Sequence, residues 1–136
     1  PKVRLPGSGR ANDVASFSHK LIIIMRQSTR SFVDRLDFLT TPGFLDGPGA
    51  REKAGLPEGG GPYRAVTQLV VYDFAPENAR MRLHSLHPGV SLEQVKDNSG
   101  FDIIIPDQYS TSPAPTPEQL KLLREEIDPA GIVLAK

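Results

Sequence analysis

The residues best suited to chemistry lie close to the beginning of the chain, in the stretch PGSGRAND from Pro6 to Asp13. Two glycines spaced by one residue let the backbone turn with its N–H groups pointing inward. A helix that begins directly after such a turn adds partial positive charge, so the loop can hold a phosphate, a carboxylate or a developing oxyanion. The same residues are typical of an ordinary tight turn with an Asx cap, and the pattern alone leaves both interpretations open.

Other catalytic constellations receive little support from the sequence. His84 and His87 are three residues apart across the end of an expected strand, so they should face opposite ways and suit a shared metal poorly. His19 is far from both in the chain, and we therefore predict no metal site. A Ser-His-Asp site is not predicted either, because the chain has no G-x-S-x-G motif and Ser8 lies within G-S-G rather than after a strand.

The composition excludes several classes of protein. The 136 residues correspond to about one ordinary domain. The 16 Lys and Arg residues balance the 16 Asp and Glu residues, so no general attraction to nucleic acid or to an anionic membrane is expected. The lack of cysteine excludes disulfides and a cysteine nucleophile, and it fits a reducing cytosol. The longest apolar run, Leu21 to Met25, is far shorter than the roughly 20 residues of a membrane-spanning helix, so we expect a soluble, cytoplasmic protein.

Two short elements are predicted to follow the glycine loop. Asn12 or Asp13 should cap a short helix over residues 14–17, because each offers a side-chain oxygen to the free N–H groups of the first turn. The run HKLIIIM, over residues 19–25, has a continuous β-branched core. Such a run is typical of a strand that is covered on both faces.

The middle of the chain is predicted to contain a long loop and a hairpin. Residues 30–40 alternate only weakly between apolar and polar, so a strand is preferred there and a helix stays possible. The many glycines and prolines of residues 41–62 predict a loop without regular elements. Residues 63–74 and 79–88 are each expected to form a strand, and the turn between them makes a hairpin.

The last part of the chain is predicted to alternate between helix and strand. A short helix should begin after Ser91 and stop before Gly100, and residues 101–106 should form a buried strand. A final helix should begin after Thr116, with Pro117 at its first position. Together the elements predict an α/β protein with an open mixed or parallel sheet and flanking helices, in which the small number of strands looks incomplete.

Several blocks of the sequence, taken in order, resemble the C-terminal part of the beta subunit of a class I CoA-transferase. Within this superfamily the chain is most similar to the glutaconate-type beta subunits, and especially to the variant that hydrolytically opens a ring of a steroid-derived CoA thioester. Blocks in the right order are far more specific than any one of them. They are the glycine loop running into Ala11-Asn12-Asp13, TPGFL at 41–45, GGGPYRAVT at 59–67, YDF at 72–74 and HPGVSLEQV at 87–95.

The resemblance implies a fold, a partner and a substrate. It implies that residues 1–136 form a single incomplete α/β domain, the C-terminal half of a subunit with the larger NagB/RpiA-like fold of CoA-transferases. The partner would be the alpha subunit of the same enzyme, in a hetero-oligomer, and coenzyme A would enter as part of an acyl-CoA substrate with no bound cofactor. The activity would be transfer of CoA between carboxylic acids or hydrolytic ring opening. A non-catalytic module for binding or subunit contact is the alternative.

The resemblance also assigns roles within the glycine loop. Contacts to the thioester or its oxyanion map to Gly7, Ser8, Gly9 and Ala11, and substrate binding maps to Arg10, Asn12 and Asp13. The nucleophilic glutamate of the transferases matches no glutamate of this chain, so no catalytic residue is expected in it. Arg10 stands where the family commonly has a second consecutive glycine. It either restricts the loop or forms a salt bridge with a substrate carboxylate or a CoA phosphate.

Overall fold

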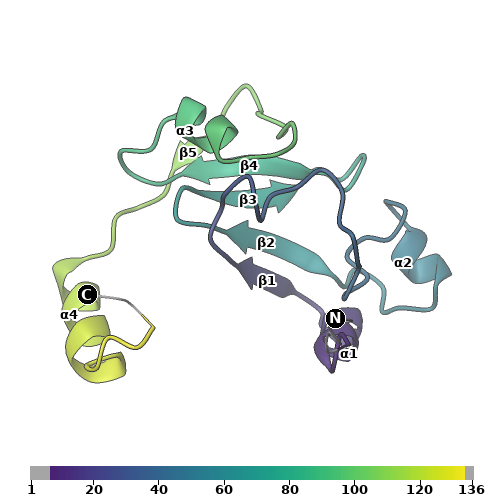
Figure 1. Ribbon diagram of the computed structural model, residues 1–136, viewed down its shortest axis with the longest axis horizontal. Coiled ribbons are helices and arrows are strands. Elements are labelled where there is room, and N and C mark those ends of the chain that lie inside the picture. Colours follow the sequence, from purple (N-terminus) through teal and green to yellow (C-terminus); the bar gives the residue numbers. More distant parts are fainter. Residues whose placement is uncertain (1–6, 134–136) are drawn as a thin grey trace, which may run out of the picture.

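The computed structural model describes residues 7–133, in which five strands form one open sheet (Figure 1). The order of the strands in the sheet follows the chain, and the outer pairs are parallel while the inner pairs are antiparallel. The predicted α/β class with an open mixed sheet is therefore confirmed. The strands are β1 (Leu21–Ile24), β2 (Pro62–Val66), β3 (Val70–Phe74), β4 (Met81–Leu86) and β5 (Ser110–Thr111).

Short helices flank this sheet. Figure 1 shows α1 and α2 together near one end of the sheet and α3 beside β4 and β5, while α4 lies apart at the end of an extended segment. The last turns of α4 continue as a π-helix, η1. The helix α2 is a single turn inside the loop predicted over residues 41–62. The bounds are α1 (Ala11–Phe17), α2 (Ala50–Lys53), α3 (Leu92–Asp97), α4 (Pro117–Leu122) and η1 (Leu123–Ile127).

Both predicted cap residues of the second half are confirmed. The Ser91 hydroxyl accepts a hydrogen bond from the Gln94 amide at 3.2 Å, and the Gln94 side chain accepts one from the Ser91 amide at 2.9 Å. Thr116 and Gln119 form the same reciprocal pair, and Pro117 follows as the first residue of α4. These capping boxes fix where each helix begins, because they satisfy amides that have no partner inside the helix.

The strand β1 is shorter and less covered than the sequence predicts. It comprises Leu21–Ile24 and is the outermost strand of the sheet, paired only with β2 among the described strands. Its side chains alternate, since Ile22 and Ile24 are 56% and 80% exposed while Ile23 packs against the core. The prediction that both faces are covered is wrong for residues 7–133, because the face that carries Ile22 and Ile24 has no described element packed on it.

The stretch predicted as one strand over residues 63–74 is a hairpin of two strands, β2 and β3. Thr67 makes the turn between them without glycine or proline. Its hydroxyl accepts hydrogen bonds from the amides of Leu69 and Val70, each at 3.1 Å, and its own amide donates to the Val70 carbonyl at 2.9 Å. The predicted single strand is wrong because a threonine side chain closes this turn. The predicted hairpin of β3 and β4 is confirmed.

The strand preferred for residues 30–40 is absent from the structure. The segment pairs only through one isolated bridge between Val33 and Gly100. The Gly100 amide donates to the Phe32 carbonyl at 2.7 Å, and a Cβ at position 100 would lie 2.5 Å from that oxygen. Gly100 therefore permits a close backbone approach. The predicted role of Gly100 as a helix stop is indirect, because α3 already ends at Asp97.

The buried strand predicted over residues 101–106 is also reduced to an isolated bridge, between Ile104 and Arg82 of β4. Pro106 lacks the N–H group with which a ladder would continue. The side chains of Phe101, Ile103 and Ile105 still pack against the core, so the apolar pattern indicates burial correctly and the element incorrectly.

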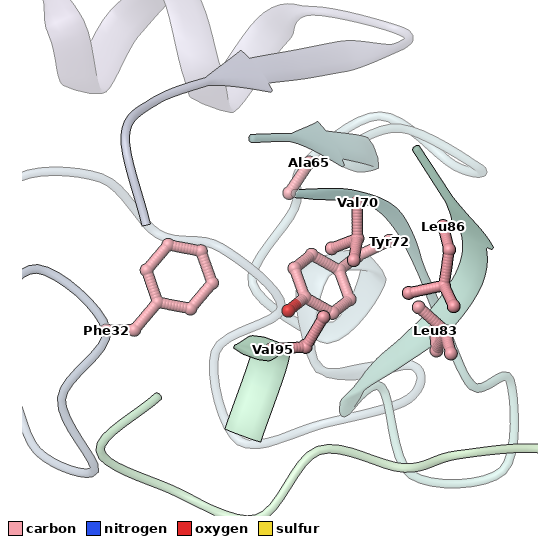
Figure 2. Packing of buried hydrophobic residues seen from close by; sticks show 7 residues of the cluster. All are labelled: Phe32, Ala65, Val70, Tyr72, Leu83, Leu86 and Val95. Atoms are coloured by element: carbon pink, nitrogen blue, oxygen red, sulfur yellow. The ribbon is translucent and has the colours of Figure 1, made fainter. Parts of the chain in front are cut away.

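The hydrophobic core lies between the central strands, α3 and the segment after β1 that contains Phe32. Figure 2 shows Tyr72 among the other members of the cluster, with Val95 of α3 close to its ring. The Phe32 ring lies 5.9 Å from the Tyr72 ring and stacks on Phe101 at 6.0 Å. The buried members are Phe32, Ala65, Val70, Tyr72, Leu83, Leu86 and Val95.

A buried glutamine connects four parts of this core. Gln27 is 1% exposed and follows β1. Its side-chain amide donates to the Val95 carbonyl at 3.1 Å and to the Ser99 hydroxyl at 2.8 Å. Its side-chain oxygen accepts from the hydroxyls of Thr67 at 3.1 Å and Tyr72 at 3.0 Å. All four hydrogen-bonding positions of the side chain are therefore used.

Candidate glycine-loop site

The glycine loop lies exposed at the beginning of α1, near one end of the sheet (Figure 1). Gly9 has φ +57°, in the left-handed region that glycine adopts without steric cost. A Cβ on Gly9 would meet nothing within 4 Å. The need for glycine at this position is therefore conformational, since space is available for a side chain. Pro6, the first residue of the predicted stretch, lies outside the described residues.

The helix α1 begins earlier than the sequence predicts, and without a side-chain cap. Its first residue is Ala11, its N-cap is Arg10, and the Ala11 amide donates to the Ser8 carbonyl at 3.2 Å. The prediction that Asn12 or Asp13 caps the helix is wrong, because this backbone turn already starts it. Asn12 lies in the first turn, where its side-chain oxygen accepts from the Ser16 hydroxyl at 2.9 Å.

The first turn of α1 leaves backbone donors free. Within residues 7–133 the amides of Asn12 and Asp13 have no acceptor, as expected for a helix start. The Ala11 amide is engaged by Ser8, so Ala11 offers no free donor in this conformation. The loop can therefore present two parallel N–H groups beside an exposed, glycine-shaped turn, which suits an anion or a developing oxyanion.

Arg10 fits this loop without strain. Its φ of −86° is right-handed, so the position does not require glycine, and the left-handed conformation falls on Gly9 instead. The side chain is exposed and has no hydrogen bond or ion pair within residues 7–133. Of the two alternatives posed by the sequence, restriction of the loop finds no support in this backbone. The guanidinium is left available for an anionic group.

Sequence reasoning missed the residue that holds the other end of α1. Arg51 of α2 is 2% exposed and donates from Nη2 to the Ser16 carbonyl at 2.9 Å. Its only signal in the sequence is a basic residue inside a glycine-rich and proline-rich loop, which ordinarily indicates a solvated surface. The contact depends on the folding of residues 43–61 back onto α1, and local patterns do not encode that path.

A pocket of about 210 Å³ lies beside Arg51, between the loop of residues 43–62 and the end of β3. Its wall includes Phe44 and Phe74, whose rings are 5.1 Å apart and meet edge to face. No residue of the glycine loop lines it. The pocket and the loop are thus separate features, and Arg51 lines the pocket while it binds the end of α1.

Two of the three histidines singled out in the sequence, His84 and His87, line one pocket but make separate contacts. His84 in β4 lies 3.9 Å from the carboxylate of Asp73, and the His87 ring nitrogen Nε2 lies 2.9 Å from the Thr67 carbonyl. Arg82 pairs with Asp73 through two contacts of 2.9 Å, and these hydrogen bonds hold the pKa of that carboxyl below its usual range. In the part of the chain that is described, no group of three or more His, Cys, Asp or Glu residues could bind a metal ion.

The helices of the described residues are short. Among residues 7–133, no helix is both long and apolar enough to span a membrane.

The family of the chain follows from its match to a family model. The model described as Coenzyme A transferase matches residues 1–98, which include the glycine loop, the core strands β1 to β4 and α3. The chain belongs to this family. The predicted resemblance to CoA-transferases is thereby confirmed.

Named relatives are similar over different lengths. The beta subunit of glutaconate CoA-transferase from Acidaminococcus fermentans is 43% identical over 129 residues, which cover 95% of this chain and 48% of the relative. The cholesterol ring-cleaving hydrolase IpdB subunit of Rhodococcus jostii is 39% identical over 70 residues, covering 52% of this chain and 28% of the relative. The chain thus spans about half the length of the glutaconate-type relative and less of the other.

The fold is also that of a solved family member. The crystal structure of glutaconate coenzyme A-transferase from Acidaminococcus fermentans superposes with a TM-score of 0.84 at 42% identity, covering 97% of this chain and 50% of that one. The open mixed sheet with flanking helices is therefore part of a CoA-transferase fold.

Proposed function

We propose that this chain contributes to the beta subunit of an enzyme that processes acyl-CoA thioesters together with an alpha subunit in the cytoplasm. The observation that carries the proposal is the exposed loop at Gly9, left-handed and directly before α1, in a chain of the CoA-transferase family. Coenzyme A is then part of the substrate, and no additional cofactor is required.

The role proposed for the loop is stabilisation of charge on the thioester oxygen. When a nucleophile attacks a thioester, negative charge develops on that oxygen, and preorganised N–H donors lower the barrier. The left-handed turn at Gly9 places donors of this kind at the amides of Asn12 and Asp13, which have no acceptor within residues 7–133. Arg10 is placed to pair with a carboxylate or phosphate of the substrate. The nucleophile itself comes from outside residues 1–136.

Transfer of CoA between carboxylic acids is the first candidate reaction. The glutaconate-type relative is similar over 95% of this chain, which favours that reaction. Hydrolytic ring opening of a steroid-derived CoA thioester is the second candidate, supported by the 39% identity to the ring-cleaving hydrolase subunit over 70 residues. In the first reaction a carboxylic acid accepts CoA, whereas in the second water is the reactant that opens the ring.

The test is an assay of the full-length subunit in complex with its alpha partner. The complex is given dicarboxylic and steroid-derived CoA thioesters, with and without an acceptor acid, and the CoA products are identified by mass spectrometry. CoA exchange that requires the acceptor acid establishes the transferase, whereas ring opening without an acceptor establishes the hydrolase. A complex that binds CoA thioesters but changes none of them would support the non-catalytic alternative.

The glycine loop is tested by Gly9→Val in the same complex. Valine at φ +57° is strained, so the loop should rearrange and lose its donor geometry. We expect kcat/KM to fall about 100-fold, the effect of losing one oxyanion donor. Gly55→Val is the matched control, because Gly55 has φ +78° with open space around it and lies outside the site. Equal losses in both variants would count against a catalytic role for the loop.

A further inference from the structure

Arg51 is a buried cation that is not neutralised by a carboxylate in residues 7–133. The residue is 2% exposed, and among the described residues its guanidinium donates only to backbone carbonyls. Its Nε atom has no hydrogen-bond partner within the described residues. A buried charge of this kind is costly unless it is well solvated by dipoles, so its contacts should have a purpose beyond stability.

The guanidinium joins the end of α1 to the loop that follows residue 41. From Nη2 it donates to the carbonyls of Ser16 at 2.9 Å and Ala15 at 3.4 Å. From Nη1 it donates to the Gly43 carbonyl at 2.7 Å. One planar group therefore holds two segments that are far apart in the sequence.

Within residues 7–133, the helix α1 buries only two of its residues. Its buried residues are Ala15 and Ser16, the two whose carbonyls Arg51 binds, while Val14 and Phe17 are 59% and 70% exposed. The last carbonyls of a helix lack partners inside it and carry partial negative charge. The last turn of α1 contains no basic residue, so Arg51 supplies from α2 the positive charge that this helix end favours.

Gly61 forms the wall against which this guanidinium packs. Its φ is +123°, and a Cβ added to it would lie 2.9 Å from the Arg51 Nε atom. The absence of a side chain at position 61 thus leaves room for the Arg51 side chain beside the start of β2. Gly61→Ala offers a second way to displace Arg51, and it also strains the backbone of residue 61 at φ +123°.

We infer that Arg51 is a positioning residue that fixes the glycine loop by anchoring the far end of α1. The helix has seven residues and is roughly 10 Å long, so a shift at Ser16 is transmitted to the turn at Gly9. The consequence for catalysis rests on the proposed function of that loop. The effect on the position and order of the loop does not depend on that proposed function.

The experiment compares Arg51→Met, Arg51→Lys and Gly61→Ala with Lys53→Met in the complex of the full-length subunit and its alpha partner. Lys53 is the matched control, because it lies in the same short helix, carries the same charge and is exposed. Amide hydrogen exchange is measured for peptides that cover residues 9–14, without substrate, and kcat and KM are measured with the CoA thioester that the complex accepts.

Arg51→Met should speed exchange at Ala11 and Val14, whose amides donate to the carbonyls of Ser8 and Arg10, and should lower kcat about tenfold to 100-fold, the range for misplaced catalytic groups. Gly61→Ala should act in the same direction but more weakly. Arg51→Lys retains the charge but loses the planar guanidinium with its several donors, so its amide exchange should lie between that of Arg51→Met and that of the unmodified protein. Lys53→Met should match the unmodified protein in exchange and kcat.

A structural role alone would give a different pattern. If exchange rises only over residues 43–61, while the glycine loop and kcat are unchanged, the inference is wrong. Should Arg51→Met fail to fold, Gly61→Ala decides by the same exchange measurement. A complex without any thioester activity would overturn the proposed function, whereas the exchange data would still decide whether Arg51 positions the loop.

Discussion

Two side chains of this protein are almost equally buried but serve regions of opposite character. Gln27, in the centre, is 1% exposed and its four hydrogen-bonding positions are satisfied by side chains and backbone of β3, α3 and the turns beside them. Arg51, near the edge, is 2% exposed and carries an Nε atom without a partner in residues 7–133. In the central region the buried polar groups satisfy one another, whereas at the edge the end of α1 is anchored by the side chain of Arg51.

The difference shows how stability and function are divided in the chain. In the centre, a satisfied polar network combined with tight apolar packing defines one arrangement of strands and helix. At the edge, α1 and β1 keep exposed apolar side chains, and the glycine loop keeps backbone donors that have no acceptor within residues 7–133. A binding loop needs such unsatisfied groups, which a stable core avoids.

The largest effect is expected in the centre, for Gln27→Met. Methionine fills a similar volume but leaves the Tyr72 hydroxyl without its acceptor and the Val95 carbonyl without one of its donors. We expect the free energy of unfolding to fall by about 3 kcal/mol, as for other broken buried networks. Denaturant unfolding of the chain measures this loss.

The matched edge variant, Asn12→Ala, removes a single hydrogen bond to Ser16 and should cost under about 0.5 kcal/mol. Similar costs for both would remove the distinction between the regions.

A smaller effect in the centre is a dependence of the free energy of unfolding on pH, which is caused by Tyr72. Burial raises the pKa of Tyr72 from 10.0 to about 12, although its hydrogen bonds to Gln27 and Ser99 oppose the shift. The unfolded chain therefore loses this proton at lower pH than the folded chain, and stability from Tyr72 falls as pH rises from 10 towards 12. Below pH 10 this contribution is fully present.

Tyr72→Phe isolates this titration. The variant should cost about 1 kcal/mol at neutral pH, because Gln27 loses one donor. The difference in unfolding free energy between the two proteins should then narrow as the pH is raised from 10 towards 12. A constant difference across that range would show that Tyr72 ionises as easily in the folded protein as in the unfolded one.

Features that depend on neighbours in the sequence could be predicted. Ser91 and Thr116 with Pro117 begin helices as expected, because a cap involves residues only three apart. Features that depend on distant segments could not. The run of isoleucines indicates a strand, but its place at the edge of the sheet follows from pairing with β2, about 40 residues later. The Thr67 turn was missed because it uses a side-chain hydroxyl in place of glycine.

The residues of the candidate site also divide into those that the sequence predicts and those that only the structure reveals. The glycine loop could be found from its residues and from the family resemblance, since a left-handed turn before a helix leaves a local signature. The relaxed φ of Arg10 and the engagement of the Ala11 amide required the structure. Arg51 could not be found, because its partners at Ala15, Ser16 and Gly43 come from segments that meet only in the folded chain.

The smallest effect is expected at the edge of the sheet. Ile23 and Ile24 are neighbours in β1 but differ in burial, so they compare a covered face with an exposed one. Ile24 is 80% exposed, whereas Ile23 points to the other face of β1 and packs against the core. Ile24→Thr should change the free energy of unfolding by less than about 0.5 kcal/mol. Ile23→Thr should cost roughly 1–2 kcal/mol, because it removes buried apolar surface and adds a hydroxyl to an apolar site. Both variants keep β-branching, so strand propensity is matched and only burial differs. Equal losses in chemical denaturation would mean that the face carrying Ile24 is covered, and that the edge region closes as the centre does.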